Sequence, residues 1–230
     1  MTYTLVTANR TYSSWSLRPW VLMKGLGIPF TDRIEPFERA VNYDAFRSFS
    51  PTGQVPALID GERTVWDSLG ITLYLAERHA GIWPQDAEAR AFAQPVACEM
   101  HSGFFHLRND CPMNVCVRVT PRPMSAELRK DIGRLREIFE HGLSRFGGPW
   151  LAGSAFGAVD AFFAPVAFRI RTYGLDVGKG QAWVEHILDH PAMREWQQAA
   201  LCETWREASH EAGLAAAGTL VEDLRVSPTR

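Results

Sequence analysis

The chain has 230 residues, of which 46% are hydrophobic and 22% charged, and its formal net charge at pH 7 is -2. This length suffices to bury a sizeable core as one large domain or two small ones. The near-neutral charge, without a basic stripe, argues against nucleic acid and against anionic membrane surfaces as partners. No apolar run approaches the roughly 20 residues of a membrane span, and the start lacks a secretory signal, so we expect a cytoplasmic protein without membrane contact.

The first 80 residues predict a small mixed sheet with helices on both faces. In chain order the expected elements are a strand over 3–7, a helix from about 16 to 25, a strand over 30–35, a weak helix or loop over 42–49, a hairpin of 57–60 and 64–66, and a helix over 68–79. The start of the first helix rests on Pro19, since proline is tolerated best in a first turn. The order βαβ then ββα is the thioredoxin-like arrangement.

Beyond a linker at 81–86 the hydrophobic pattern becomes helical. Helices are expected over 87 to about 107, 125–146, 158–173, 182–188, 191–201 and 204–212. No segment after the linker alternates convincingly as a strand. We therefore expect a thioredoxin-like domain over 1–81, an all-helical domain over 87–214, and a flexible tail over 215–230, which is small, polar and uncapped.

The loop before the third predicted strand has the features of a backbone site for a peptide-like ligand. Pro56 lacks an N–H and stands directly before the apolar run 57–59. An X-Pro bond is the common route to a cis peptide, and a cis bond here would direct the N–H and C=O of Val55 away from the sheet, toward an extended ligand. An ordinary tight turn is the alternative. The acid and hydroxyl of Asp67 and Ser68 favour the ligand site.

These features together resemble the soluble glutathione transferase family. The segment 12–18, with Ser13 and Ser14 before the first helix, resembles the hydroxyl motif of the serine-type branch, the zeta class (maleylacetoacetate isomerase-like) and its bacterial relatives. The Val55-Pro56 loop and the helical second half extend the resemblance over nearly the whole chain except the tail. It implies glutathione as cosubstrate and a symmetric homodimer, although fold alone does not establish catalysis.

By this resemblance Ser13 is the activating hydroxyl and Ser14 its neighbour. A thiol with a pKa of about 8.5 is mostly protonated at neutral pH, and a hydroxyl that donates to the sulfur near a helix N-terminus favours the thiolate. Capping of the helix is the alternative role of these serines. A shift of one or two residues in the alignment would bring Thr11 or Tyr12 forward instead.

The resemblance also assigns the contacts to glutathione. Asp67 and Ser68 match the pair that holds the γ-glutamyl end, since an acid suits its ammonium and helix N–H groups suit its carboxylate. The glycine carboxylate meets a lysine in the zeta class, but that position is Gly53 here, so an arginine, Arg39 or Arg47, is the substitute. The assigned residues are Gln54, Val55, Pro56, Asp67, Ser68 and Arg39.

The acceptor site is expected along the helix that ends near residue 107. His101, Phe105 and Arg108 are the candidates, since spacings of four and three place them near one face, although His101 could serve a dimer interface instead. Zeta isomerases carry an arginine late in the helix that is expected here over 158–173, and this position falls near Thr172. This departure argues against maleylacetoacetate isomerisation specifically.

Gly157 and Asp160 match the folding motif of the family, in which an acid three residues after the cap bonds back to the backbone. We expect Asp160 to be structural and not catalytic.

The leading hypothesis is an enzyme that activates the glutathione thiol for conjugation or for glutathione-dependent isomerisation of an electrophile. The alternatives are a non-catalytic binding or regulatory protein on the same fold and a glutathione-dependent peroxidase. A thiol transferase would need a cysteine at the first helix, and none precedes Cys98. The four cysteines show no zinc spacing, so no metal is expected.

Overall fold

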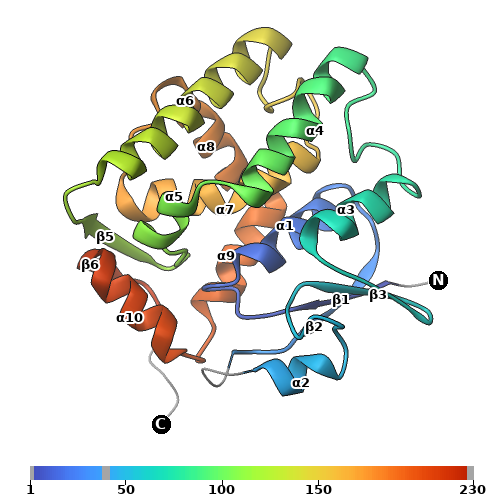
Figure 1. Cartoon of the computed structure of the whole chain (residues 1–230), viewed down its shortest axis with the longest axis horizontal. Coiled ribbons are helices and arrows are strands. Elements are labelled where there is room, and N and C mark those ends of the chain that lie inside the picture. The colour runs from blue at the N-terminus through green and yellow to red at the C-terminus, as the bar shows by residue number, and fades with distance from the viewer. Residues whose placement is uncertain (1–2, 38–41, 227–230) are drawn as a thin grey trace.

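A four-stranded mixed sheet with the strand order β2-β1-β3-β4 forms the N-terminal half of the molecule (Figure 1). Its strands are β1 (Tyr3–Thr7), β2 (Phe30–Ile34), β3 (Ala57–Asp60) and β4 (Arg63–Val65). β1 pairs parallel with β2 and antiparallel with β3, and the predicted hairpin joins β3 to β4. This is a computed structural model, and the residues that it describes are 3–37 and 42–226.

Helices cover both faces of this sheet, which confirms the predicted thioredoxin-like arrangement. α1 (Ser14–Gly25) and α3 (Ser68–Ala76) lie on the face toward the second half, and α2 (Tyr43–Arg47) lies on the opposite side (Figure 1). α1 begins two residues before the predicted start, so Pro19 lies in its second turn. The first helical bond, from the Leu17 N–H to the Ser13 carbonyl at 3.2 Å, forms ahead of this proline. The bond that Pro19 cannot donate is offset by the burial of most of the helix.

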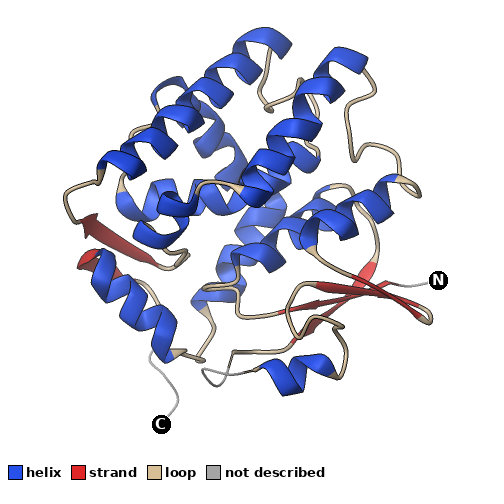
Figure 2. Cartoon of the chain, viewed as in Figure 1, coloured by secondary structure: helices blue, strands red, loops and turns tan. Residues whose placement is uncertain are grey.

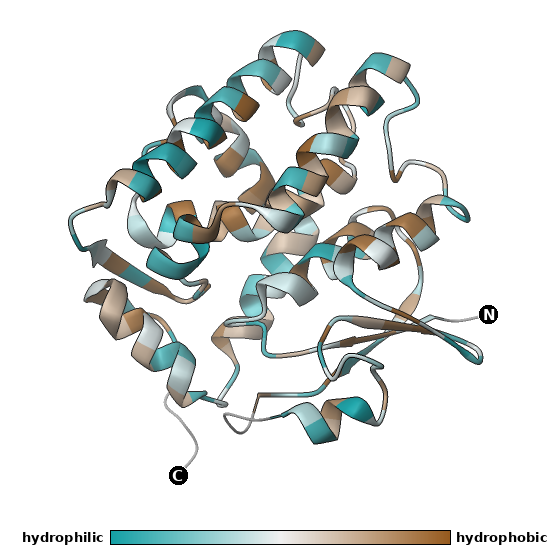
Figure 3. Cartoon of the chain, in the orientation of Figure 1, coloured by the Kyte–Doolittle hydropathy of each residue, from teal (hydrophilic) through white to brown (hydrophobic). Residues whose placement is uncertain are grey.

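The second half consists mainly of helices packed around α7 (Ala158–Tyr173). Every residue of α7 except Arg171 is buried, and α7 contacts α1, α4 and α8, so one hydrophobic core joins the two halves. Hydrophilic and hydrophobic segments alternate along the outer helix α6 (Figure 3), as expected for a helix with one face on the core. The helices are α4 (Ala87–Ser102), α5 (Phe105–Asp110), α6 (Ala126–Phe146), α7, the 3-10 turn η1 (Gly178–Gly180), α8 (Gln181–Asp189), α9 (Pro191–Leu201) and α10 (Ala208–Ala217).

The helix predicted over 87 to about 107 is interrupted between α4 and α5. Phe104 adopts a left-handed conformation with φ of 59°. A Cβ on Gly103 would lie 2.9 Å from the carbonyl oxygen of Glu99, so this close approach requires glycine. The backbone turns here, and the residues predicted for the acceptor site are divided between two helices.

A second, two-stranded sheet contradicts two expectations for the C-terminal half. β5 (Val117–Pro121) pairs antiparallel with β6 (Gly218–Asp223), in a segment that we expected to be a flexible tail (Figure 2). Val117 and Val119 are buried while Arg118 is half-buried, so a short alternation was present in the sequence. This alternation is too short to predict a strand by itself, and the partner strand lies about a hundred residues later, beyond the reach of any local pattern. The second half is therefore mainly helical but not all-helical.

Arg225 fastens the end of the described chain. Its guanidinium donates to Glu211 on α10 at 2.6 Å and to Asp223 at the end of β6 at 2.7 Å. The side chain of Arg225 is only 7% exposed. The Leu224 N–H also donates to the Cys116 carbonyl at 3.0 Å. These contacts hold 218–225 against the body of the protein.

Replacing Arg225 with methionine is expected to lower the free energy of unfolding by about 1 to 2 kcal/mol. The carboxylates of Glu211 and Asp223 lose their cation, but both are about one third exposed, so water moderates the loss. Urea denaturation measures the change. Arg194→Met is the matched control, since Arg194 pairs with Asp189 on the open surface. Equal stability losses in the two variants would contradict the proposed role of Arg225.

Candidate functional site

A cavity of about 760 Å³ lies between the Val55-Pro56 loop and the start of α10. Its walls come from four parts of the chain: the start of α1, the segment after β2 with α2, the loops before β3 and α3, and the N-terminus of α10. The lining residues are Trp15, Phe37, Asn42, Tyr43, Phe46, Thr52, Gly53, Gln54, Val55, Pro56, Trp66, Asp67, Glu207, Ser209 and His210. A cavity that combines aromatic walls with a few convergent polar groups is the usual form of a small-molecule site.

The Val55-Pro56 peptide bond is cis, as the sequence indicated, and both residues line the cavity. The Val55 N–H and C=O form no hydrogen bond with another residue in the described part of the chain. They are therefore available to an extended ligand. Gln54 also lines the cavity, so three of the residues predicted to hold a peptide lie together on one wall.

Gly53 occupies the position where the resemblance to the zeta class predicts a lysine. Its φ is +66°, and a Cβ at this position would lie 2.5 Å from a ring carbon of Tyr43. The left-handed conformation favours glycine, and a larger residue would also displace the Tyr43 ring. Of the arginines predicted to substitute, Arg39 lies outside the described residues, and Arg47 on α2 is exposed, with its guanidinium 6.0 Å from the centre of the Tyr43 ring.

Asp67 and Ser68 begin α3 but have different environments. Asp67 is the N-cap, accepting hydrogen bonds from the N–H groups of Leu69 at 2.8 Å and Gly70 at 3.2 Å, and its side chain is 55% exposed in the cavity wall. Ser68 is fully buried, with its hydroxyl 3.5 Å from an Arg18 nitrogen. The structure thus presents the carboxylate of the predicted pair to the cavity and holds the serine hydroxyl behind it.

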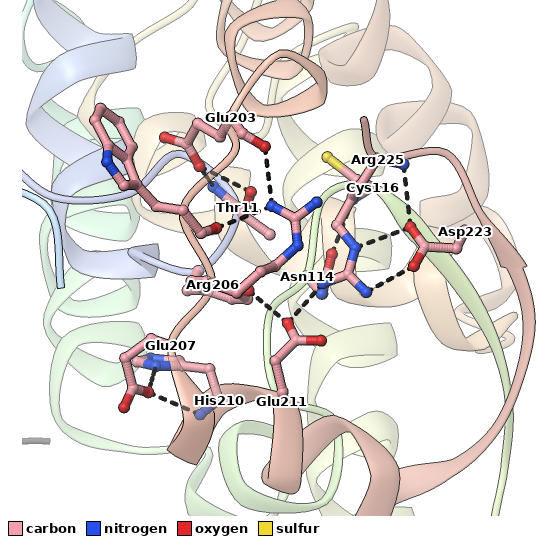
Figure 4. Close-up of polar contacts among 12 residues, drawn as sticks. Thr11, Asn114, Cys116, Glu203, Arg206, Glu207, His210, Glu211, Asp223 and Arg225 are labelled. Carbon is pink, nitrogen blue, oxygen red and sulfur yellow. Dashed lines mark hydrogen bonds and ion pairs between the residues drawn. The ribbon is translucent and has the colours of Figure 1, made fainter. Parts of the chain in front are cut away.

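Two of the four candidate hydroxyls donate to carboxylates of the C-terminal segment. The Thr11 hydroxyl donates to Glu203 at 2.8 Å (Figure 4). The Tyr12 hydroxyl donates to Glu211. Glu203 also accepts from the Thr11 N–H at 3.0 Å, so the turn between β1 and α1 is fastened to the segment before α10. Burial raises the pKa of Tyr12, and its bond to Glu211 raises it further. Both hydroxyl protons are therefore engaged inside the protein.

The serine hydroxyls are placed differently. Ser13 occupies the N-cap position of α1 without a capping bond, and its hydroxyl donates to the Ser16 hydroxyl at 2.7 Å. Ser14 is the first residue of α1, and its hydroxyl has no hydrogen bond with a described residue. Both side chains are buried, at 5% and 8% exposure, and neither is part of the cavity lining. Of this turn and the start of α1, Trp15 is the residue that lines the cavity.

The candidates for the acceptor site are only partly brought together. The Nε2 atom of His101 lies 3.2 Å from an Asp67 oxygen, and its ring meets the edge of Trp15 at 5.2 Å between centroids. The Arg108 guanidinium lies 4.9 Å from the centre of the same Trp15 ring. Burial lowers the pKa of His101, an effect that Asp67 opposes. Phe105 is 67% exposed, and none of these three residues lines the cavity, although His101 and Arg108 contact Trp15, which does.

Sequence reasoning missed the wall that α10 contributes. Glu207, Ser209 and His210 line the cavity opposite Gln54 and Val55. A helix was expected over 204–212, but no local signal indicates that its first turn packs against Tyr12 in the turn before α1, about two hundred residues earlier. Only the three-dimensional structure could reveal these residues.

Metal-binding clusters, membrane-spanning helices and free thiols were also sought in the structure. Within 3–37 and 42–226 no group of three or more His, Cys, Asp or Glu side chains is arranged to hold a metal ion. In the same ranges no helix has the length and apolar character to cross a membrane. The thiols of Cys111 and Cys116 are free, and burial raises the pKa of each to about 12. These two thiols are therefore protonated at neutral pH.

Comparison with known proteins gives two family matches. Residues 12–78 match the model of the glutathione S-transferase N-terminal domain, and residues 124–199 match that of the C-terminal domain. Glutathione S-transferase theta-1 of Homo sapiens is 27% identical over 212 residues, which cover 84% of this chain and 81% of that protein. A zeta-class glutathione S-transferase of Euphorbia esula is 28% identical over 123 residues, covering 52% of this chain and 55% of its own.

Solved structures show the same fold. A glutathione transferase homologue from Burkholderia with bound glutathione superposes with a TM-score of 0.65 at 21% identity, covering 86% of this chain and 98% of that one. Ure2p in complex with glutathione gives a TM-score of 0.63 at 18% identity, covering 84% of this chain and 97% of that one. At these identities the likeness is one of architecture.

Proposed function

Because the chain belongs to the glutathione S-transferase family, we propose that it binds glutathione in the cavity beside Val55 and activates the thiol for attack on an electrophilic small molecule. The observation that carries this proposal is the convergence of the unpaired backbone groups of Val55 with the carboxylate of Asp67 in one cavity. The first turn of α1 lies beside it, supplying hydroxyls and a helix N-terminus.

The cavity wall suits an extended tripeptide in one orientation. The Val55 N–H and C=O would pair with the cysteinyl backbone, and Gln54 would bond the adjacent peptide group. The exposed carboxylate of Asp67 would hold the γ-glutamyl ammonium, and the N–H groups at the start of α3, including that of Ser68, suit the γ-glutamyl carboxylate. In this orientation the sulfur would point toward the start of α1.

The first turn of α1 would then stabilise the thiolate. A hydrogen bond from Ser13, with Ser14 as its neighbour, and the positive end of the helix both favour the charged sulfur over the neutral thiol. The thiolate is the nucleophile, so its enrichment at neutral pH accelerates attack on an acceptor. His101 and Arg108, which flank Trp15, would face the acceptor.

Conjugation fits this chain better than maleylacetoacetate isomerisation. At the position of the zeta-class arginine, Thr172 is buried and donates to the Asn114 carbonyl at 2.8 Å. The neighbouring Arg169 is also buried, donating to the Cys111 carbonyl at 2.9 Å. Thr172 carries no charge, and the guanidinium of Arg169 is engaged inside the protein, so neither side chain presents a cation to an acidic substrate. We expect a homodimer located in the cytoplasm. Light scattering on the purified protein tests whether it is a dimer.

Calorimetry with glutathione, combined with conjugation assays on an aryl halide and an epoxide, tests the proposed function. We expect binding in the micromolar range together with turnover of at least one electrophile. Absent or only millimolar binding would instead favour a regulatory protein on this fold. Binding without conjugation, but with reduction of an organic peroxide, would favour the peroxidase alternative.

Asp67→Ser is expected to weaken glutathione binding about tenfold or more, since a hydrogen bond to a charged group contributes about 1.5 to 3 kcal/mol. Serine keeps an N-cap oxygen for α3, so the helix start should survive the loss of charge. Calorimetry measures the affinity.

The control for Asp67→Ser is Asp86→Ser, because Asp86 caps α4 in the same manner, accepting from the Ala89 N–H at 2.8 Å, and does not line this cavity. Equal affinities in the two variants would contradict the contact assigned to Asp67.

A further inference from the structure

A carboxylate–histidine pair stands at the start of α10, on the cavity wall opposite the Val55-Pro56 loop. The Nδ1 atom of His210 lies 2.6 Å from the Oε2 atom of Glu207 (Figure 4). Both residues line the cavity, and the imidazole side chain is 35% exposed while the carboxylate is 4% exposed. A buried acid that bonds one nitrogen of an accessible imidazole is the arrangement of a general base.

The protonation of this pair follows from its hydrogen bonds. Glu207 accepts from the Ser209 hydroxyl at 2.5 Å, from the Ser209 N–H at 3.1 Å and from the His210 N–H at 2.9 Å. Burial alone would raise the pKa of Glu207, but these donors outweigh it and lower the pKa to about 2. An ionised carboxylate can only accept, so the proton shared with His210 belongs to Nδ1. In the neutral ring the Nε2 atom is then the basic nitrogen.

The ring of His210 is held between two aromatic side chains. It stacks on Tyr12 with centroids 4.8 Å apart and planes inclined by 24°, and on Phe37 with centroids 5.4 Å apart and planes inclined by 15°. Tyr12 directly precedes Ser13, and Phe37 follows β2. The stacking and the bond to Glu207 together restrict the imidazole to one orientation beside the turn that carries the candidate hydroxyls.

The other titratable and charged groups near the ring have hydrogen-bond partners of their own. On the β1–α1 side, Tyr12 donates its hydroxyl to Glu211. On α10 and beyond, Glu211 accepts from Arg225 at 2.6 Å, and Arg206 donates to the Val226 carbonyl at 2.7 Å. On the facing wall, Asp67 caps α3 and contacts His101. Among the described residues, Glu207 is therefore the acid that bonds directly to His210.

We propose that His210 is the general base of this cavity, accepting the proton that the glutathione thiol releases. This inference rests on the proposed function. A serine hydroxyl that donates to the sulfur stabilises the thiolate but provides no place for the released proton, whereas the neutral imidazole does. Glu207 is a positioning residue, which fixes the tautomer and stabilises the imidazolium.

The step is balanced as follows. The S–H bond breaks with its electron pair remaining on sulfur, and the proton forms a bond to Nε2 of His210. The thiolate then forms an S–C bond to the electrophile, and the leaving group departs with its electron pair, or the carbanion formed by addition keeps it. The imidazolium returns the proton to that group or to water, which restores the neutral ring.

Two replacements of His210 test the proposal. His210→Asn keeps a donor toward Glu207 and removes the base, and His210→Phe keeps the stacked ring and removes both nitrogens. We expect both to lower kcat/KM for conjugation about ten- to a hundredfold near neutral pH, with glutathione affinity by calorimetry similar to that of the wild type. His141→Phe is the matched control, since His141 stacks on Phe92 at 5.2 Å, away from the cavity.

The pH profile separates a base from a merely structural residue. The deficit of both variants should shrink at alkaline pH, where solvent hydroxide deprotonates the thiol, and added imidazole should restore part of the rate to His210→Asn. A uniform loss at every pH, or an unchanged rate, would overturn the proposal. If neither variant folds, Glu207→Gln is measured instead, and a rate deficit that does not diminish with pH would count against the base.

Different results would refute the proposed transferase function and the proposed role of His210 as the base. A wild-type protein that neither binds glutathione nor conjugates an electrophile would refute the proposed function and the base with it. A wild-type protein that does both, together with a fully active His210→Asn variant, would refute the base alone.

Discussion

Replacing Asp160 by alanine is expected to lower the free energy of unfolding by about 4 kcal/mol. This carboxylate is fully buried and accepts from the Leu151 N–H at 2.9 Å, the Gly157 N–H at 3.2 Å and the indole N–H of Trp183 at 2.9 Å. Each donor left without an acceptor costs about 1 to 3 kcal/mol, and alanine leaves three of them. The effect is large because Asp160 joins the start of α7 both to α8, through Trp183, and to the loop before α7, through Leu151.

Guanidinium denaturation at neutral pH measures the loss. Asp160→Asn should lose less, because its amide oxygen can still accept, and Glu185→Ala on the exposed face of α8 is the control for a surface acid. A loss below about 1 kcal/mol in Asp160→Ala would show that other donors or water replace the carboxylate.

The stability difference should also depend on pH. Burial raises the pKa of Asp160 to about 6 from an ordinary value of 3.8, so the folded protein binds a proton more tightly than the unfolded chain. The stability linked to this proton is present below the unfolded pKa and is lost as the pH rises through the folded pKa. The deficit of Asp160→Ala should therefore be larger near pH 4 than near pH 8. An equal loss of stability in Asp160→Ala at pH 4 and at pH 8 would contradict a raised pKa for Asp160.

Ser13→Ala is expected to lower turnover ten- to a thousandfold while leaving glutathione affinity nearly intact. The hydroxyl would contribute through one oriented hydrogen bond to the developing thiolate, and the loss of one such donor has effects of this size. The binding contacts of Val55 and Asp67 are unaffected by the change. Steady-state conjugation kinetics and calorimetry on the same preparation separate the two effects.

Neighbouring replacements show which hydroxyl acts. Thr11→Val and Tyr12→Phe should leave the chemistry largely intact, because both hydroxyls donate to glutamates within the protein. A greater loss in Ser14→Ala than in Ser13→Ala would transfer the role to Ser14, whose hydroxyl has no partner among the described residues. Unchanged rates in all four variants would defeat the hydroxyl mechanism.

The thioredoxin-like half could be predicted because its signals are local. Each signal involves only a few consecutive residues: the period-two alternation in the strand over 3–7, the Asp60-Gly61 turn, and the proline before an apolar strand. The order of elements then restricts the sheet to few topologies. Val55, Pro56 and Asp67 could be recognised for the same reason, because the cavity wall that they form consists mostly of residues close to one another in the chain.

The tertiary structure alone decided which side chains meet. β6 pairs with β5 across about a hundred residues, and this pairing orders a segment whose own composition predicts a flexible tail. The same docking directs Glu203 and Glu211 onto the hydroxyls of Thr11 and Tyr12, and it brings His210 to the cavity. Such contacts depend on packing between distant elements, which no sequence window records. Local sequence patterns therefore predict the thioredoxin-like half, most helices of the second half and the wall expected to bind the peptide. Long-range packing instead sets the second sheet, the wall formed by α10 and the partners of the candidate hydroxyls.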